Sequence, residues 1–353
     1  MASTTDLNVE PFDVDTATEA ELKARHALLN AIEQETAPED PPTPYGSMVE
    51  DFRTKMSWRE SDRWAVWDGS DHSRMVGFAV LNRQYTESNR NLAWFWIEVD
   101  RDHRGQHLAT RLLEQVVAAA EADERTLLGC GAIQDSDGAG FLDALGATNR
   151  AIERKSRLDI REVDDALLQQ WVDEAAVKAP GYSLVVWDAP TPEEHIEGYV
   201  RISHVMNTAP RDDLEMEDSV HTVERQRELE ERSLATGHRW HTVCARHDDS
   251  GDFAGFTDVG FSKWFDDLGW QGGTAVDPVH RGKGIGRWLK AAMLQHLKVA
   301  KPDIWRIDTW NAGSNEHMLA INNDLGFEVV QWFGDWQVPT AELKAAVAKR
   351  LGS

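Results

Sequence analysis

The sequence predicts an α/β protein built from two similar domains, each with a mixed, mostly antiparallel sheet flanked by helices. A chain of 353 residues is longer than one compact core usually accommodates. The tripeptide His103-Arg104-Gly105 recurs 177 residues later as His280-Arg281-Gly282, and Leu145-Gly146 recurs 180 residues later as Leu325-Gly326. Each tripeptide follows an apolar run that ends in Val-Asp and precedes an amphipathic run of helix length. Repeats of this period indicate duplicated domains and not a solenoid, whose repeats span ~20–50 residues.

The second half has clear starts and stops for its elements. After an expected strand at 181–187, Thr191, Pro192 and Glu194 have the order of cap residue, proline and acid that is typical of a helix start. A second helix is expected over about 220–234. The remaining expected elements are a hairpin over about 241–261 with its turn at 248–251, strands at 270–276, 304–309 and 327–332, and helices at 286–298 and 315–325.

The first half has a similar order. Thr18 and Glu21 form a capping box before a helix, and the proline-rich stretch 38–44 interrupts the chain. The further elements expected are a hairpin around 68–73, a helix from residue 108, and strands near 94–99, 126–130 and 154–160. We therefore expect domains at residues 1–160 and 161–353.

Composition excludes several classes of protein. The chain has 37 Lys and Arg against 61 Asp and Glu, a formal net charge of −24, so we expect no nucleic-acid partner and no attraction to anionic membranes. Cys130 and Cys244 have no CxxC or Cys/His spacing, which excludes a disulfide framework and a thiolate zinc site. Residues 1–10 are polar, and the most continuous apolar run, 92–97, is far shorter than a membrane span. We expect a cytoplasmic protein without a membrane segment.

A glycine-rich turn in the second half has the features of an anion site. Residues 276–290 read as the end of a strand, a turn with glycines at 282, 284 and 286, and the start of a helix. Glycine lets backbone N–H groups approach a ligand closely, and a helix N-terminus receives phosphate well. An ordinary tight turn remains the alternative.

Charge favours the anion site. Residues 279–302 have a net charge of +6, whereas the aligned window 102–125 has a net charge of −2. The alternative is that Lys290, Lys298 and Lys301 lie on a solvated helix face.

The pattern excludes two common nucleotide sites. No Lys-Ser or Lys-Thr follows the last glycine, as a Walker A loop requires, and Leu289 stands where the dinucleotide fingerprint needs Gly or Ala. A nucleotide-dependent oxidoreductase is therefore disfavoured.

These residues resemble a known family. Arg281-Gly282-Lys283-Gly284-Ile285-Gly286 matches the Q/R-x-x-G-x-G/A signature of the GNAT superfamily of N-acetyltransferases, whose loop holds the pyrophosphate of acetyl-CoA. The region from Asn311-Ala312 and Asn315 to Leu325-Gly326-Phe327 is similar to the N-x-x-A…L-G-F region of that family. Each half then resembles one GNAT domain, in the arrangement of mycothiol synthase-like tandem GNAT proteins.

The resemblance implies an acetyl-CoA-dependent N-acetyltransferase that acts on a primary amine of a small molecule by direct transfer in a ternary complex. It implies no metal, and a monomer or homodimer. The residues it implies for CoA binding are Ala275, Val276, Arg281, Gly282, Lys283, Gly284, Ile285, Gly286, Arg287 and Asn315.

The first half departs from the family pattern. His107 stands where the signature has its first required glycine, and its side chain would obstruct the approach of phosphate to the backbone. Asp135 stands eleven residues before Gly146, whereas Asn315 stands eleven residues before Gly326. With the acidic charge of the window, these features predict that the first half binds CoA poorly or not at all.

The catalytic residues are less evident. Removing a proton from a lysine-like amine at pH 7 costs ~4.6 kcal/mol, so a carboxylate base would help. Asp258 is the candidate base, with a solvated strand residue as the alternative. Asn322 occupies the position where GNAT enzymes often have a tyrosine that protonates the leaving thiolate. The missing tyrosine and the degenerate first half leave a non-catalytic acyl-CoA-binding or sensing protein as the alternative function.

An acidic run precedes the second expected helix of the second half. Residues 212–218 contain five carboxylates, which could attract a cationic acceptor or belong to an ordinary polar loop.

Overall fold

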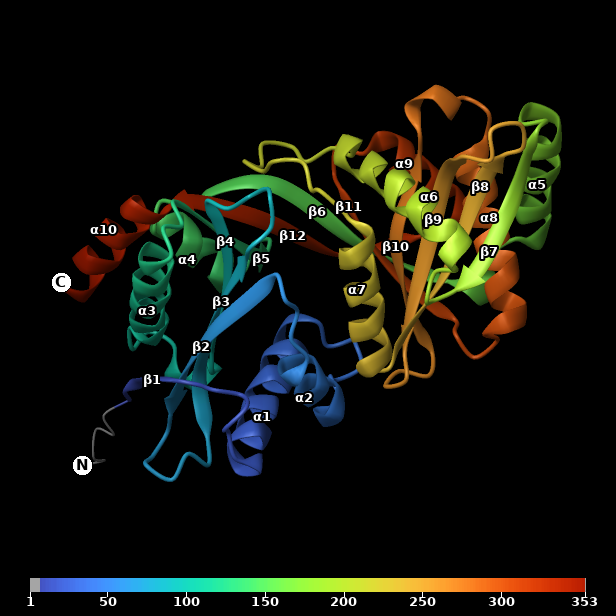
Figure 1. Cartoon of the computed structure of the whole chain (residues 1–353). Helices are drawn as coiled ribbons and strands as arrows, with labels where there is room; N and C mark the ends of the chain where they lie inside the picture. Colours follow the sequence, from blue (N-terminus) through green and yellow to red (C-terminus); the bar gives the residue numbers. More distant parts are fainter. Residues whose placement is uncertain (1–6, 353) are drawn as a thin grey trace. The chain divides into compact units, whose positions relative to one another are not determined.

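The chain folds into two compact units (Figure 1). The computed structural model describes residues 7–352. The first unit runs to residue 151 and also contains 213–217 and the chain from 333 onward; the second contains 152–212 and 218–332. A single division near residue 161 therefore does not describe the compact units, because the last strand of each half runs on into the other unit. The division of the repeat into residues 1–160 and 161–353 stays a prediction. Of the polar segment 1–10, residues 1–6 lie outside the described part.

The sheet of the first unit has the strand order β1-β2-β3-β4-β5-β12. Its strands are antiparallel except for the parallel pair β4 and β5. Their bounds are β1 (Val9–Pro11), β2 (Arg59–Trp67), β3 (Met75–Gln84), β4 (Leu92–Val99), β5 (Leu127–Ile133) and β12 (Glu328–Pro339), of which residues 333–339 pair with β5.

Helices cover both faces of this first sheet. One core contains apolar residues of α3 and α10, and the other contains apolar residues of α1 together with the opposite face of β2 and β3. The helices of this unit are α1 (Glu19–Thr36), α2 (Tyr45–Arg53), α3 (Leu108–Ala122), α4 (Asp137–Ala144) and α10 (Thr340–Leu351), with a 3-10 turn η1 (Arg101–His103).

The sheet of the second unit has the strand order β6-β11-β10-β9-β8-β7. Only β10 and β11 are parallel. The bounds are β6 (Thr148–Asp159), β7 (Tyr182–Asp188), β8 (His238–His247), β9 (Phe253–Ser262), β10 (Leu268–Val276) and β11 (Arg306–Ala312).

Alternation along the strands assigns the helices of the second unit to two faces. Val243 and Ala245 pack in one core with α5 and α8, whereas Cys244 packs in another with α6. The helices are α5 (Asp165–Lys178), α6 (Glu193–Ser203), α7 (Val223–Ala235), α8 (Ile285–Ala300) and α9 (Glu316–Leu325), with 3-10 turns η2 (Ile160–Glu162), η3 (His204–Thr208) and η4 (Pro278–His280).

The structure confirms the α/β fold with two similar domains. The capping box of Thr18 and Glu21 is present, since the Thr18 hydroxyl accepts from the Glu21 N–H and Glu21 accepts from the Thr18 N–H. The helices expected at 286–298 and 315–325 form as α8 and α9. The helices α5 and α10 were not predicted from the sequence.

None of the helices within residues 7–352 has the length and apolar content that crossing a bilayer requires.

Candidate functional site

A groove in the second unit opens where two parallel strands separate. β10 and β11 pair only at Leu268–Trp270 and Arg306–Asp308, after which β10 continues beside β9 and β11 beside β6. The resulting groove has a volume of about 710 Å³. Its wall includes Thr274, Ala275 and Val276 of β10, on the edge that no longer pairs with β11.

The glycine-rich turn and the start of α8 form one end of this groove. Gly282 and Gly284 have φ angles of 80° and 78°, a left-handed conformation that glycine adopts without steric cost. Gly284 is the N-cap of α8, so the first N–H groups of the helix face the groove entrance. The Arg281 side chain donates to the Val276 carbonyl over 2.9 Å and to the Thr208 hydroxyl over 3.1 Å, and no carboxylate within residues 7–352 pairs with it.

Nine of the ten residues expected to bind CoA line this groove. They are Ala275, Val276, Arg281, Gly282, Gly284, Ile285, Gly286, Arg287 and Asn315. Lys283 is not among the lining residues: its Nζ lies 2.7 Å from the Tyr182 hydroxyl, which also contacts His280 Nδ1 at 2.8 Å.

The basic run of 279–302 is not one continuous surface. Arg287 pairs with Asp324 at 2.8 Å, and Lys298 donates to the Val163 carbonyl at 3.2 Å and pairs with Asp165 at 2.5 Å. Lys290 is only 3% exposed, so the reading of this run as a solvated helix face is wrong for Lys290. Arg281 and Arg287 are its two cations that line the groove.

Asp258 lies beside a bulge in β10. Gly272 and Gly273 together stand opposite Asp258, where the register of β9 and β10 shifts. A Cβ on Gly273 would lie 2.8 Å from the Phe256 ring, so this close approach requires glycine. Asp258 is 8% exposed, which is incompatible with a solvated strand residue.

The surroundings of Asp258 suit a proton acceptor near neutral pH. Burial raises the pKa of its carboxyl to about 7, against hydrogen bonds from the Gly273 N–H and the Tyr199 hydroxyl. The Tyr199 hydroxyl lies 3.4 Å from both carboxylate oxygens. Burial is also the main cause that raises the pKa of Tyr199 well above its usual value. This phenol therefore stays protonated and donates to the carboxylate.

A buried lysine holds the other face of the bulge. Lys290 Nζ donates to Gln271 Oε1 over 3.2 Å, and the Gln271 amide donates to the Asp258 carbonyl over 2.6 Å and the Thr257 hydroxyl over 3.1 Å. Burial lowers the pKa of Lys290 to about 7. This buried lysine was not predicted, because a lysine in a basic run resembles a surface residue.

Lys290→Met is expected to raise the free energy of unfolding by a few kcal/mol at pH 7. The unfolded state binds the Lys290 proton more tightly than the folded state, so wild-type stability should rise with pH from about 7 to 10.5, and the variant should lack this rise. Urea unfolding at about pH 7 and pH 9 measures the difference. Lys298→Met on the same helix is the control; an equal gain there would contradict the assignment to burial.

Asn322 supplies no acid to the groove. Its side chain is 1% exposed, and its amide donates to Asn311 Oδ1 over 2.8 Å. Asn315 caps α9 by accepting from the Met318 N–H over 3.3 Å.

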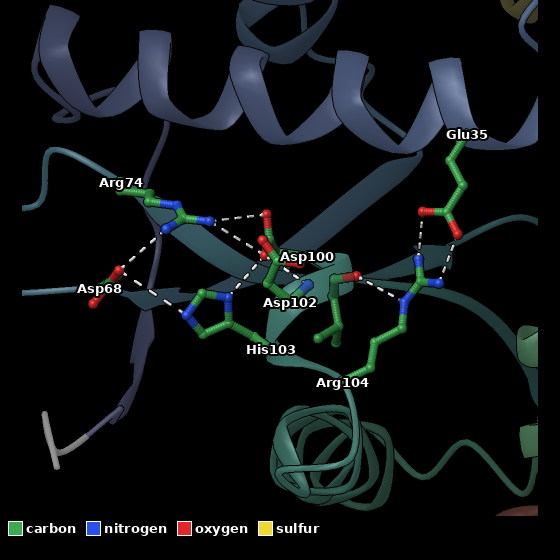
Figure 2. A network of polar contacts seen from close by, with 8 residues as sticks. Glu35, Asp68, Arg74, Asp100, Asp102, His103 and Arg104 are labelled. Carbon is green, nitrogen blue, oxygen red and sulfur yellow. Dashed lines mark hydrogen bonds and ion pairs between the residues drawn. The ribbon is translucent and has the colours of Figure 1, made fainter. Parts of the chain in front are cut away.

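The equivalent turn in the first unit has the same backbone but different chemistry. Gly105 and His107 have φ angles of 77° and 61°, so His107 occupies the left-handed N-cap position of α3 that Gly284 occupies in α8. Figure 2 shows that the Arg104 guanidinium points to Glu35: its two terminal nitrogens lie 2.7 and 2.8 Å from the two carboxylate oxygens. The hydrogen bonds from Arg104 are the main cause that lowers the pKa of Glu35. The positive charge of Arg104 is therefore neutralised within the first unit.

Acidic groups surround the rest of this first turn. Asp100 Oδ1 lies 2.8 Å from His103 Nδ1, and Arg74 bridges Asp68 and Asp100 at 3.4 Å (Figure 2).

The parallel strands of the first unit differ in two further ways from those of the second. β4 pairs with β3 from Ala93 to Val99 without a bulge. The Trp94 ring covers Gly129 of β5 so closely that a Cβ there would lie 2.8 Å from the ring. The point where β4 and β5 separate is therefore occupied by an indole.

No residue of the acidic segment 212–218 is among those that line the groove. Residues 213–217 belong to the first compact unit, where Glu215 pairs with Arg150 at 2.9 Å and its N–H donates to Gln337 over 2.8 Å. The Glu217 N–H donates to Asn89 Oδ1 over 2.8 Å. These contacts favour the polar-loop alternative.

Comparison with known proteins identifies the family. The model of the acetyltransferase (GNAT) family matches residues 27–139 and 203–320. No curated protein matches the chain in sequence.

Solved structures share the fold. A tandem GNAT protein from the clavulanic acid biosynthesis pathway, solved without AcCoA, is 24% identical with a TM-score of 0.77, over 95% of this chain and 99% of that one. A GCN5-related N-acetyltransferase from Sphaerobacter thermophilus is 14% identical with a TM-score of 0.65, over 95% and 96%. N-myristoyltransferase of Saccharomyces cerevisiae, solved with myristoyl-CoA and inhibitors, is 12% identical with a TM-score of 0.56, over 94% and 80%.

Proposed function

Because the chain belongs to the GNAT family of acetyltransferases, with one domain in each half, we propose that its second unit transfers the acetyl group of acetyl-CoA to a primary amine of a small molecule. Members of this family use an acyl-CoA as donor. The observation that carries the proposal is the groove, in which separated parallel strands, left-handed glycines and a helix start meet with Arg281.

Each part of the groove suits a part of acetyl-CoA. The first N–H groups of α8, with Arg281 and Arg287, would receive the pyrophosphate. The amide groups of the pantetheine arm would find polar partners on the unpaired edge of β10 at Thr274–Val276. The thioester would then lie toward the bulge, beside Asp258.

The reaction we propose is a direct transfer. The neutral amine attacks the acetyl carbon, a C–N bond forms, the C–S bond breaks, and the CoA thiolate leaves. Asp258 accepts the proton of the amine, directly or through a water molecule, and with a pKa of about 7 it is substantially ionised at neutral pH. The Tyr199 hydroxyl, hydrogen-bonded to both carboxylate oxygens, would hold Asp258 in position.

Cysteine chemistry supports direct transfer over an acetyl-enzyme intermediate. Cys130 and Cys244 are both buried. Burial raises the pKa of Cys130 to about 12 and that of Cys244 well above its usual value. Neither thiol would supply the thiolate that a covalent route requires.

A CoA-release assay across a panel of small primary amines tests the proposal. We expect turnover on at least one amine and intersecting initial-rate lines, as a ternary complex requires. Acetyl-CoA binding without CoA release on any amine would favour the non-catalytic acyl-CoA-binding function, which the buried Asn322 amide also suits. Parallel initial-rate lines would contradict direct transfer.

A further inference from the structure

Three residues that are distant in sequence bring potential metal ligands together on one face of the second sheet. Asp188 and His241 are cross-strand partners at the end of β7 and in β8, so their side chains project to the same face. His241 alternates in phase with Val243 and Ala245, which pack toward α8, and α8 carries His296. One ligand atom from each of Asp188, His241 and His296 lies within 4.8 Å of the other two.

His241 Nδ1 cannot form a full hydrogen bond with both of its neighbours in this cluster. His241 Nδ1 lies 2.5 Å from Asp188 Oδ1 and 3.0 Å from His296 Nε2. This nitrogen carries either one hydrogen or one lone pair. If it donates to Asp188, the His296 nitrogen competes for the same hydrogen; if it accepts from His296, its lone pair faces the carboxylate. A cation between the three atoms would let all three act as acceptors at once.

The ligand types and their surroundings favour a particular class of cation. Two imidazoles and one carboxylate are a common ligand set for Zn²⁺, with water in the fourth position. Ligand atoms ~2.1 Å from a tetrahedral ion lie ~3.4 Å apart, so His241 Nδ1 would move ~0.9 Å further from Asp188 Oδ1 and ~0.4 Å further from His296 Nε2. The Asp188 side chain is 70% exposed and the His241 side chain 5%, so solvent reaches the cluster at Asp188 while His241 is buried. The Lys301 charge also acts on His241 and would reduce the affinity.

We propose that Asp188, His241 and His296 bind one divalent transition-metal ion of the Zn²⁺ class. None of the three lines the groove, so the ion would not take part in acetyl transfer. It would join β7, β8 and α8 instead. Because α8 begins at the groove, the ion would brace the helix that presents its N–H groups there. The proposal does not depend on the proposed activity, since its test measures metal binding.

The experiment uses the full chain without a histidine tag, stripped of metal by a chelator. Zn²⁺ is titrated against a chromophoric chelator, and Co²⁺ is added separately to record its visible ligand-field spectrum. We expect one Zn²⁺ per chain, a Co²⁺ spectrum typical of nitrogen and oxygen ligands, and a rise in Tm with Zn²⁺ concentration.

Two variants and a control locate the site. Asp188→Asn changes an exposed side chain without changing its shape, and His296→Gln preserves most of the volume on α8; each is expected to weaken Zn²⁺ binding about 100-fold or more. His107→Ala removes an exposed histidine of the first unit and should bind Zn²⁺ as wild type does.

Two results would overturn the proposal. One is wild-type protein that does not compete with the chelator for Zn²⁺. The other is an unchanged affinity in both Asp188→Asn and His296→Gln, which would place the ion elsewhere.

Discussion

Gly284→Glu is expected to lower the affinity of the chain for acetyl-CoA by about 100-fold or more. Gly284 has a φ of 78° and caps α8, so its replacement puts a side chain and a negative charge where the helix N–H groups would meet the pyrophosphate. Isothermal titration with acetyl-CoA measures the loss.

The duplication supplies a matched control. His107 occupies the same left-handed N-cap position in the first unit, at a φ of 61°. His107→Glu therefore introduces the same charge at the same backbone position without affecting the proposed site, and acetyl-CoA affinity should stay unchanged. Equal losses in both variants, or wild-type affinity in a folded Gly284→Glu protein, would remove the basis for the CoA site.

Asp258→Asn is expected to lower kcat by about 100-fold or more while the KM for acetyl-CoA changes little. The amide keeps the shape of the carboxylate but accepts no proton. Burial raises the pKa of Asp258 to about 7, so the wild-type carboxylate forms as the pH rises through neutrality. The ratio of wild-type to variant kcat/KM should therefore grow with pH up to about 7 and then level off. Taking this ratio cancels the titration of the amine substrate, which is common to both proteins.

Tyr199→Phe separates positioning from proton transfer. The Tyr199 hydroxyl contacts the carboxylate of Asp258, and neither residue is among those that line the groove. The hydrogen bond from Tyr199 lowers the pKa of Asp258, so its removal should raise the pH at which the rate rises. The remaining reaction should be slower but still depend on Asp258. A pH-independent ratio between wild type and Asp258→Asn would place the base elsewhere.

Local sequence signals predicted the glycine-rich turn and α8, two parts of the proposed CoA groove. The glycines at 282 and 284 mark a turn whose backbone needs positive φ, and the apolar spacing of 286–298 is that of a helix with one buried face. Both signals depend on residues close in sequence, and both hold in the structure. The same local reasoning identified His107 as the departure at the equivalent turn of the first unit.

Features that depend on tertiary contacts could not be predicted in this way. Glu35 neutralises Arg104 from a helix 69 residues away, and Tyr199 reaches Asp258 from 59 residues away. Lys290 carries the charge pattern of a surface residue, yet it lies on the buried side of α8 under Gln271. Burial and long-range pairing decided these cases.

The cluster of Asp188, His241 and His296 is a further case. The resemblance implied no metal, and the spacing of the cysteines excluded only a thiolate zinc site. Here the pairing of β7 with β8 and the packing of α8 bring together residues that are 53 and 55 positions apart.

We propose that only the second unit holds acetyl-CoA, and calorimetric titration of the wild-type chain distinguishes one site from two. We expect one acetyl-CoA per chain, with binding lost in Gly284→Glu and kept in His107→Glu. Two acetyl-CoA molecules bound with similar affinity would contradict it, because the turn from Arg104 to Ala109 would then receive phosphate despite the Glu35 pair and the His107 side chain.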